Sequence, residues 1–247
     1  MRISAAIITH NAVEAGLERC LASLAGLDDI VVLDQASDDG TVQLCERFGA
    51  RVVRGEWQGF GRTKAAAVAH TRNRWVLSID SDEELTPELR ASLLALGDDP
   101  PRAAYAVNRQ SRFLGRWIRH CGWHPEWVVR LFDKERAGFN DKPVHESVEV
   151  RGTVGRLDGL LRHYTYETME QYVTRLNRYT TLSAQEAFAA GRRASLPGAI
   201  VRSKLAFLRM YFLRLGFLDG WHGLVLCLCS AYYVLVKYVK IWRAGRP

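Results

Sequence analysis

Over the first hundred residues, short apolar runs alternate with segments of helical period, and this alternation constrains the fold more than any other feature. A βαβαβ order implies a parallel sheet with right-handed crossovers and helices on its faces. At 247 residues, the chain suits one such α/β domain with an extension. The predicted strands are 3–9, 30–33, 52–53 and 75–79, and the predicted helices are 13–24, 41–48, 61–70 and one that begins after Thr86.

The fourth predicted strand leads into Asp80-Ser81-Asp82. Residues two apart in a strand point to the same face, and open α/β sheets bind ligands at the carboxyl ends of their strands. Mg²⁺ and Mn²⁺ are held by one or two carboxylates plus substrate phosphates, so Asp80 and Asp82 predict a metal–diphosphate site. The alternative is that both acids only cap the next helix, although Thr86 and Pro87 give that helix a start of its own.

Polar residues also follow the first two predicted strands. Thr9 and His10 point into the crevice above the sheet, whereas Asn11 with Glu14 also fits a purely structural capping pair. Asp34 ends the second strand, where a carboxylate can accept hydrogen bonds from a base or ribose.

The stretch 59–64 is rich in glycine and ends in Lys64. It lacks the spacing of a P-loop and of a dinucleotide fingerprint, which excludes both classes of nucleotide site. Lys64 near a helix start can still meet a diphosphate, and the alternative is solvated surface charge.

A loop at 112–124 is rich in Arg and Trp, which suits an acceptor that carries sugars and phosphates. The alternative is a solvated loop with some aromatic side chains packed under it. His120, Cys121 and His124 resemble a zinc site in composition, but a fourth ligand with sensible spacing is missing.

The net charge of +7 predicts an anionic partner, and no nucleic-acid-binding motif is present. Residues 221–236 carry no charged side chain except His222, and basic and aromatic residues follow. Sixteen residues fall short of the roughly 20 that span a bilayer, so we predict interfacial or re-entrant helices on an anionic membrane surface. The alternative is a buried helix pair that completes a soluble core. Five cysteines without a CxxC pattern, and no secretory signal, predict a cytosolic location.

Three motifs occur in order: ITHN at 8–11, VVLDQASDDGT at 31–41 and VLSIDSDEEL at 76–85. This triple resembles the family 2 glycosyltransferases of GT-A fold, although that family usually has Tyr in place of His10. The resemblance implies a Rossmann-like, mostly parallel sheet flanked by helices. It also implies a nucleotide-sugar donor, with Asp80 near the ribose or sugar and Asp82 on a divalent metal. The implied donor-binding set is Thr9, His10, Asn11, Asp34, Lys64, Asp80 and His163.

The segment around Glu146 is similar to the one that carries the catalytic base in a bacterial cell-envelope branch of this family. Inverting transfer needs a base for the acceptor hydroxyl, and a carboxylate within hydrogen-bond reach can serve. Glu146 is therefore the predicted base, with Asp141 as its rival and a surface glutamate as the structural alternative. His163 resembles a histidine that reaches the metal or diphosphate, and its alternative is a structural role.

The tail at 215–223 resembles that of lipopolysaccharide-core glycosyltransferases, notably β-1,4-glucosyltransferases of the inner core. The implied activity is transfer of a hexose, glucose first, from a UDP-sugar to a lipid-linked oligosaccharide. The implied location is the cytoplasmic face of the bacterial inner membrane. Residues 1–165 would be the catalytic domain and residues 166–247 a helical, membrane-associating region.

Three other functions remain open at this point. A polyprenyl-phosphate glycosyltransferase would use a phosphate oxygen as nucleophile and would not need Glu146. A sugar-nucleotide nucleotidyltransferase would not need the apolar tail, and a non-catalytic membrane module would bind nucleotide without turnover.

Overall fold

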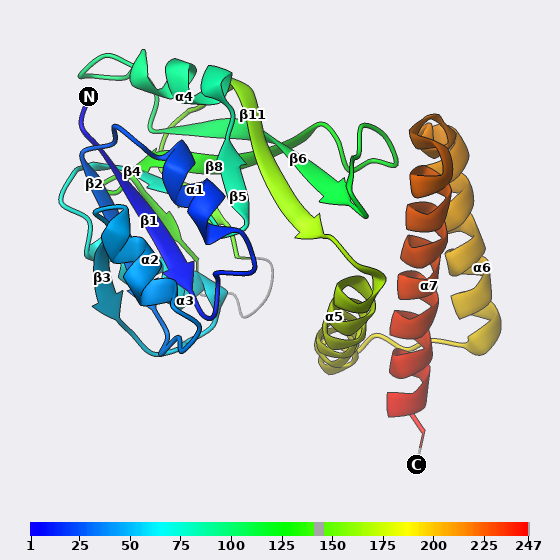
Figure 1. Cartoon of the computed structure of the whole chain (residues 1–247). Coiled ribbons are helices and arrows are strands. Elements are labelled where there is room, and N and C mark those ends of the chain that lie inside the picture. The colour runs from blue at the N-terminus through cyan, green and yellow to red at the C-terminus, as the bar shows by residue number, and fades with distance from the viewer. Residues whose placement is uncertain (141–145, 247) are drawn as a thin grey trace. The chain divides into compact units, whose positions relative to one another are not determined.

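The computed structural model describes residues 1–140 and 146–246, which are coloured along the chain in Figure 1. They divide into two compact units. The first unit contains residues 1–109 and 126–164, and the second contains residues 110–125 and those from Thr165 onward. The division into catalytic and membrane-associating regions at residue 165 stays a prediction about function.

The sheet of the first unit contains most of the strands. Their bounds are β1 Ile3–Thr9, β2 Asp29–Asp34, β3 Arg51–Arg54, β4 Trp75–Ser78, β5 Glu83–Leu85, β6 Ala104–Phe113, β8 Glu126–Asp133 and β11 Val154–Tyr166. The first four predicted strands pair in parallel, as predicted, and their order in the sheet is β3-β2-β1-β4. From β4 the order continues β8-β6-β11-β5, and the pairs β4–β8, β8–β6 and β11–β5 are antiparallel.

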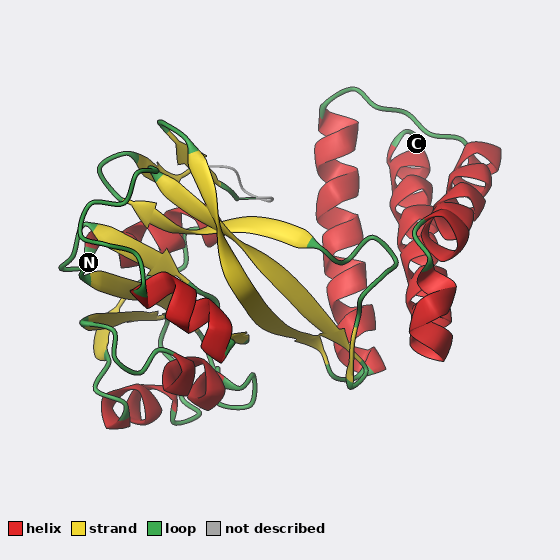
Figure 2. Ribbon diagram, turned by 90° about the horizontal axis from the view of Figure 1, so that it is seen from above, coloured by secondary structure: helices red, strands yellow, loops and turns green. Residues whose placement is uncertain are grey.

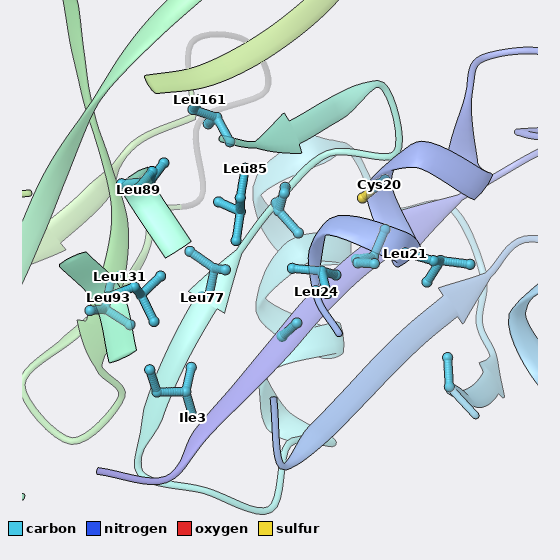
Figure 3. Close-up of a cluster of buried hydrophobic side chains, with 14 of the residues drawn as sticks. Ile3, Cys20, Leu21, Leu24, Leu77, Leu85, Leu89, Leu93, Leu131 and Leu161 are labelled. Atoms are coloured by element: carbon cyan, nitrogen blue, oxygen red, sulfur yellow. The ribbon is translucent and has the colours of Figure 1, made fainter. Parts of the chain in front are cut away.

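Helices cover both faces of this sheet (Figure 2). They are α1 Leu17–Ser23, α2 Thr41–Arg47, α3 Phe60–Ala69 and α4 Pro87–Leu94. Alternate residues of β1 face opposite sides, because side chains alternate along a strand. Ile3, Ala5 and Ile7 pack with α1, α2 and α4, whereas Ala6 packs with α3. Figure 3 shows the larger of these two clusters, in which Leu77 and Leu131 lie beside the leucines of α4.

Two local predictions have different outcomes. Thr86 is confirmed as the N-cap of α4, because its hydroxyl accepts a hydrogen bond from the Leu89 N–H. The predicted start of the first helix is wrong, because Val13 is exposed and α1 begins only at Leu17. Asn11 therefore does not cap α1, whose N-cap position is Gly16 in a left-handed conformation.

A smaller antiparallel sheet of β9 (Ala137–Phe139) and β10 (Val148–Val150) flanks the segment that contains Glu146. The Asn140 side-chain amide donates to the Ser147 hydroxyl at 2.8 Å, and the Asn140 N–H donates to the Ser147 carbonyl at 3.1 Å. These two bonds join Asn140 to Ser147, the residue that follows Glu146 in the chain.

The second unit is mainly helical. It contains β7 Arg116–Trp117, α5 Met169–Ala189, α6 Leu196–Leu208, a π-turn Arg209–Leu213, a 3₁₀ turn Gly216–Asp219 and α7 Gly220–Ala244. Helix α7 packs against both α5 and α6, as Figure 1 shows. Its core joins Phe113 and Ile118 with Tyr172 and Leu226.

The last helix is longer than predicted. The expected apolar run of sixteen residues lies inside the 25-residue helix α7, which continues through Lys237 and Lys240. Within the described residues, Gly216–Ala244 is long and apolar enough to cross a membrane by length and composition. The predicted length was too short because the helix continues past its apolar run into the basic residues that follow.

Candidate active site

Thr9 and Asp34 meet at the carboxyl ends of β1 and β2, which are neighbours in parallel register. The buried Thr9 hydroxyl donates to Asp34 Oδ1 at 3.0 Å, and the Ser37 N–H donates to Asp34 Oδ2 at 3.0 Å. The Asp34 carboxylate thus organises the turn after β2. A contact from Asp34 to a nucleotide stays a prediction.

His10 and Asn11 also bind the segment that follows β2. The His10 ring donates through Nδ1 to the Gln35 carbonyl at 2.8 Å, and the Asp38 N–H donates to Asn11 Oδ1 at 3.0 Å. Both side chains are exposed, so they lie at the edge of the sheet where a nucleotide can approach.

Lys64 contacts two of the carboxylates that were predicted to belong to the site, Asp80 and Glu146. Its Nζ is 2.8 Å from Asp80 Oδ1 and 3.1 Å from Glu146 Oε1, and its side chain is only 7% exposed. The alternative of a solvated surface lysine is therefore wrong. This ammonium joins two predicted site residues that lie far apart in the sequence, one after β4 and one between β9 and β10.

Arg130 on β8 binds the other oxygen of Asp80 at 2.7 Å and also bonds Glu83, whose side chain is fully buried. Arg109 extends this network from Glu83 to Glu126, with a distance of 2.8 Å to Glu126 Oε1. Burial alone would raise the pKa of the Asp80 carboxyl, but Arg130 and Lys64 outweigh it and hold that pKa well below its usual range. Asp80 is therefore a carboxylate at neutral pH.

Asp82 and His163 form a second pair, in which Asp82 Oδ2 lies 3.4 Å from His163 Nε2. His163 is placed by the pairing of β11 with β5, which also joins the Tyr164 N–H to the Asp82 carbonyl at 2.9 Å. Burial raises the pKa of the nearby Cys20 thiol, and the charges of Glu83, Asp82 and Asp80 raise it further. The carboxylates of Glu83, Asp82 and Asp80 therefore lie close to Cys20 at this end of the sheet.

A family model for glycosyl transferase family 2 matches residues 4–165, which include all of these site residues. The chain belongs to glycosyl transferase family 2. A lipopolysaccharide core biosynthesis glycosyltransferase of Rhizobium meliloti, LpsC, is 29% identical over 98% of this chain and 92% of its own length. An uncharacterised glycosyltransferase of Rickettsia typhi is 28% identical over 97% of this chain and 86% of its own length.

Solved structures show the same GT-A fold. The mannosyltransferase PcManGT of Pyrobaculum calidifontis, solved with GDP-mannose and Mn²⁺, aligns with a TM-score of 0.55 and 16% identity. The alignment covers 99% of this chain and 88% of that one. Staphylococcus aureus TarS, solved with UDP-GlcNAc, aligns with a TM-score of 0.50 and 16% identity over 98% and 90% of the two chains. The resemblance inferred from the three motifs is therefore confirmed at the level of family and fold.

Family membership makes the chain an enzyme that transfers a glycosyl group. The nucleotidyltransferase and the non-catalytic membrane module are thereby set aside. The roles of individual residues in this glycosyltransferase are not settled by the match, so Glu146 as base and the metal ligands stay predictions. Asp141, the rival base, lies outside the described residues.

Arg130, Arg109 and Glu83 were not predicted as site residues of this glycosyltransferase. Arg130 and Glu83 contact Asp80, and Arg109 contacts Glu83. One signal was available, since Arg130 interrupts an otherwise apolar strand and a charged residue buried in a strand needs a partner. The identity of that partner depends on the antiparallel pairing of β8 with β4, which no local pattern indicates.

Proposed function

We propose that this glycosyltransferase moves a hexose, with glucose as the first candidate, from a UDP-sugar to the inner core of lipopolysaccharide with inversion. One structural observation carries the proposal: the Lys64 ammonium holds Glu146 beside Asp80, at the carboxyl ends of the parallel strands. The kinship with LpsC, which aligns over nearly the whole chain and acts in lipopolysaccharide core biosynthesis, supports the acceptor class.

Glu146 is suited to act as the general base. Its side chain is 21% exposed, so an acceptor hydroxyl can reach it, and the hydrogen bond from Lys64 fixes the direction of the carboxylate. As the hydroxyl oxygen attacks the anomeric carbon, its proton passes to Glu146 and the bond to the nucleoside diphosphate breaks. A carboxylate in this position accelerates such a step by about 10²–10⁴-fold.

Asp82 and His163 fit a divalent metal, since the Asp82 carboxylate, in the turn just before β5, approaches the imidazole nitrogen of His163 on β11. Among the described residues, no group of three or more His, Cys, Asp or Glu is arranged to hold a metal. The protein would thus supply few ligands and leave the rest to diphosphate and water, as Mg²⁺ commonly requires. When bound, the metal neutralises charge on the departing diphosphate.

Asp80 suits a different role from Asp82. Both of its oxygens bind cationic side chains, Lys64 on one side and Arg130 on the other. We assign Asp80 the positioning of Lys64 and contact with the donor, and we assign the metal chiefly to Asp82. With a lipid-linked acceptor, the location that we propose for the enzyme is the cytoplasmic face of the bacterial inner membrane.

The direct test incubates purified enzyme with UDP-, GDP- and dTDP-hexoses, lipid-A-core acceptor, and Mn²⁺ or Mg²⁺. Metal-dependent transfer from one UDP-hexose is expected, and removal of the metal by a chelator should abolish it. The Asp82→Ala variant should lose essentially all transfer while its circular dichroism spectrum is unchanged. Full activity of that variant would refute the metal role, and transfer to polyprenyl phosphate instead of the core would refute the proposed acceptor.

A further inference from the structure

The turn between α6 and α7 exposes a continuous run of large apolar side chains. We define the apolar tip as Phe212, Leu213, Leu215, Phe217, Leu218 and Trp221, all of which are exposed. Leu213 is 79% exposed and Trp221 is 59% exposed. Single exposed apolar residues are ordinary, but a cluster of this kind marks an interaction surface.

The net formal charge of the protein comes from the segment that runs from α6 to the C-terminus, and two of its basic residues, Arg209 and Arg214, lie at the apolar tip. Residues 196–247 contain eight of the 34 Lys and Arg but only one of the 27 Asp and Glu, which is Asp219. The preceding 195 residues therefore hold 26 of each sign, and the whole net charge of +7 belongs to the α6–α7 segment. Arg209 and Arg214 lie within the turn itself and are exposed. Such a surface complements anionic lipid headgroups.

The one acidic residue of this segment is withdrawn from the surface. Asp219 is 2% exposed, and its carboxylate accepts hydrogen bonds from the His120 N–H at 2.8 Å and from the Arg119 N–H at 3.2 Å. The His120 ring lies 3.2 Å from the same carboxylate. These contacts satisfy the negative charge internally and tie the apolar tip to the 110–125 segment of the same unit.

Contacts between α5 and α7 oppose a membrane-spanning arrangement. Lys240 Nζ donates to the Asn177 side chain at 2.8 Å and to the Thr181 hydroxyl at 2.7 Å, so the C-terminal half of α7 is bound to α5. Helix α5 carries the exposed charges Arg178 and Glu186. A lipid-surrounded α7 would have to lose these contacts or draw charged side chains into hydrocarbon, which is costly.

We propose that the apolar tip inserts into one leaflet of an anionic bilayer, with Arg209 and Arg214 at the phosphates and α7 not crossing the membrane. This inference deepens the membrane part of the proposed function and rests on it. Charge favours lipid over a second copy of the chain as the occupant, because two such tips would bring positive surfaces together. The lipid phosphates supply the opposite charge.

The test is cosedimentation of the full-length enzyme with preformed vesicles, either of phosphatidylcholine alone or of equal parts phosphatidylcholine and phosphatidylglycerol. We expect binding to the anionic vesicles that weakens at high salt. Leu213→Glu should weaken it by about tenfold or more, because the exposed leucine no longer enters the leaflet. The matched control, Leu94→Glu on α4, changes an equally apolar exposed site in the first unit and should bind normally.

The mode of insertion is tested with Leu213→Cys and a membrane-impermeant maleimide, with the parent protein as background. In-leaflet insertion predicts labelling in free solution and protection on vesicles. Labelling by reagent trapped inside the vesicles would show that the tip crosses the bilayer, and would overturn the proposal. Equal vesicle binding by Leu213→Glu and wild type, or dimers without vesicle binding, would also overturn it. No sugar donor is used, so this result is independent of glycosyl transfer.

Discussion

Arg130 is the residue whose removal best tests the charge network around Asp80. Its guanidinium, 8% exposed, binds Asp80 at 2.7 Å and the fully buried Glu83. Arg130→Met keeps much of the apolar stem but removes the charge. It leaves two carboxylates that each lack one cationic partner, the fully buried Glu83 and Asp80, whose side chain is 26% exposed.

The magnitude follows from the remaining contacts. Loss of one partner from a buried ion pair costs about 3–5 kcal/mol, because the other charge stays buried. Asp80 keeps Lys64 at 2.8 Å and Glu83 keeps Arg109 at 3.4 Å, so we expect the lower end, about 3 kcal/mol. For a chain of this length, that loss corresponds to a decrease in Tm of about 6–12 °C. Arg130→Lys keeps the charge but cannot bridge both acids, and its loss should be intermediate.

The assay is urea-induced unfolding followed by circular dichroism, with the free energy of unfolding extrapolated to water. The matched control is Arg47→Met, which breaks the exposed pair with Glu18 at 3.5 Å and should change that free energy by less than about 0.5 kcal/mol. If Arg130→Met and Arg47→Met are equally stable, the network contributes nothing measurable and the electrostatic reasoning for this site is wrong.

Two further predictions concern other parts of the molecule. Burial alone would raise the pKa of the Asp133 carboxyl, but hydrogen bonds, including one from Arg74, lower it below its ordinary value. The Asp133 carboxylate therefore stabilises the fold above about pH 4. In urea titrations, the difference in free energy of unfolding between wild type and Asp133→Asn should shrink as the pH falls below that value. A difference that stays constant with pH would contradict this. In Gly223→Ala, the new Cβ would lie 1.9 Å from the Gly216 carbonyl oxygen. The Tm of Gly223→Ala should fall, because overpacking costs about 2 kcal/mol. The control Gly97→Ala places its Cβ in open space and should leave Tm unchanged. Equal Tm values for the two variants would refute the clash.

The elements that were predictable are those whose signal lies within a short window. The alternating and apolar runs placed β1 correctly at Ile3–Thr9, and the Thr86-Pro87 pair gave the start of α4. The first helix was misplaced because Val13 has the right spacing for its apolar stripe, yet Gly16 in a left-handed conformation ends the preceding turn there. Spacing alone does not report such a backbone constraint.

The candidate site was predictable only in part for the same reason. Strand ends located Asp80 and Asp82, since parallel strands bring their carboxyl ends to one edge. The bridge from Lys64 to Glu146 joins residues far apart in the chain, and the contacts of Arg130 depend on the pairing of β8 with β4. Such pairings are properties of the assembled sheet and leave no local pattern.

The most direct test of the account compares wild type and Glu146→Gln in the transfer of glucose from UDP-glucose to lipid-A-core acceptor with Mn²⁺. Glutamine has nearly the same shape as glutamate but cannot take the acceptor proton. We predict that wild type transfers and that Glu146→Gln is slower by about 10²–10⁴-fold with unchanged UDP-glucose binding. Transfer by Glu146→Gln at the wild-type rate, or no transfer by wild type from any UDP-hexose, would contradict the account.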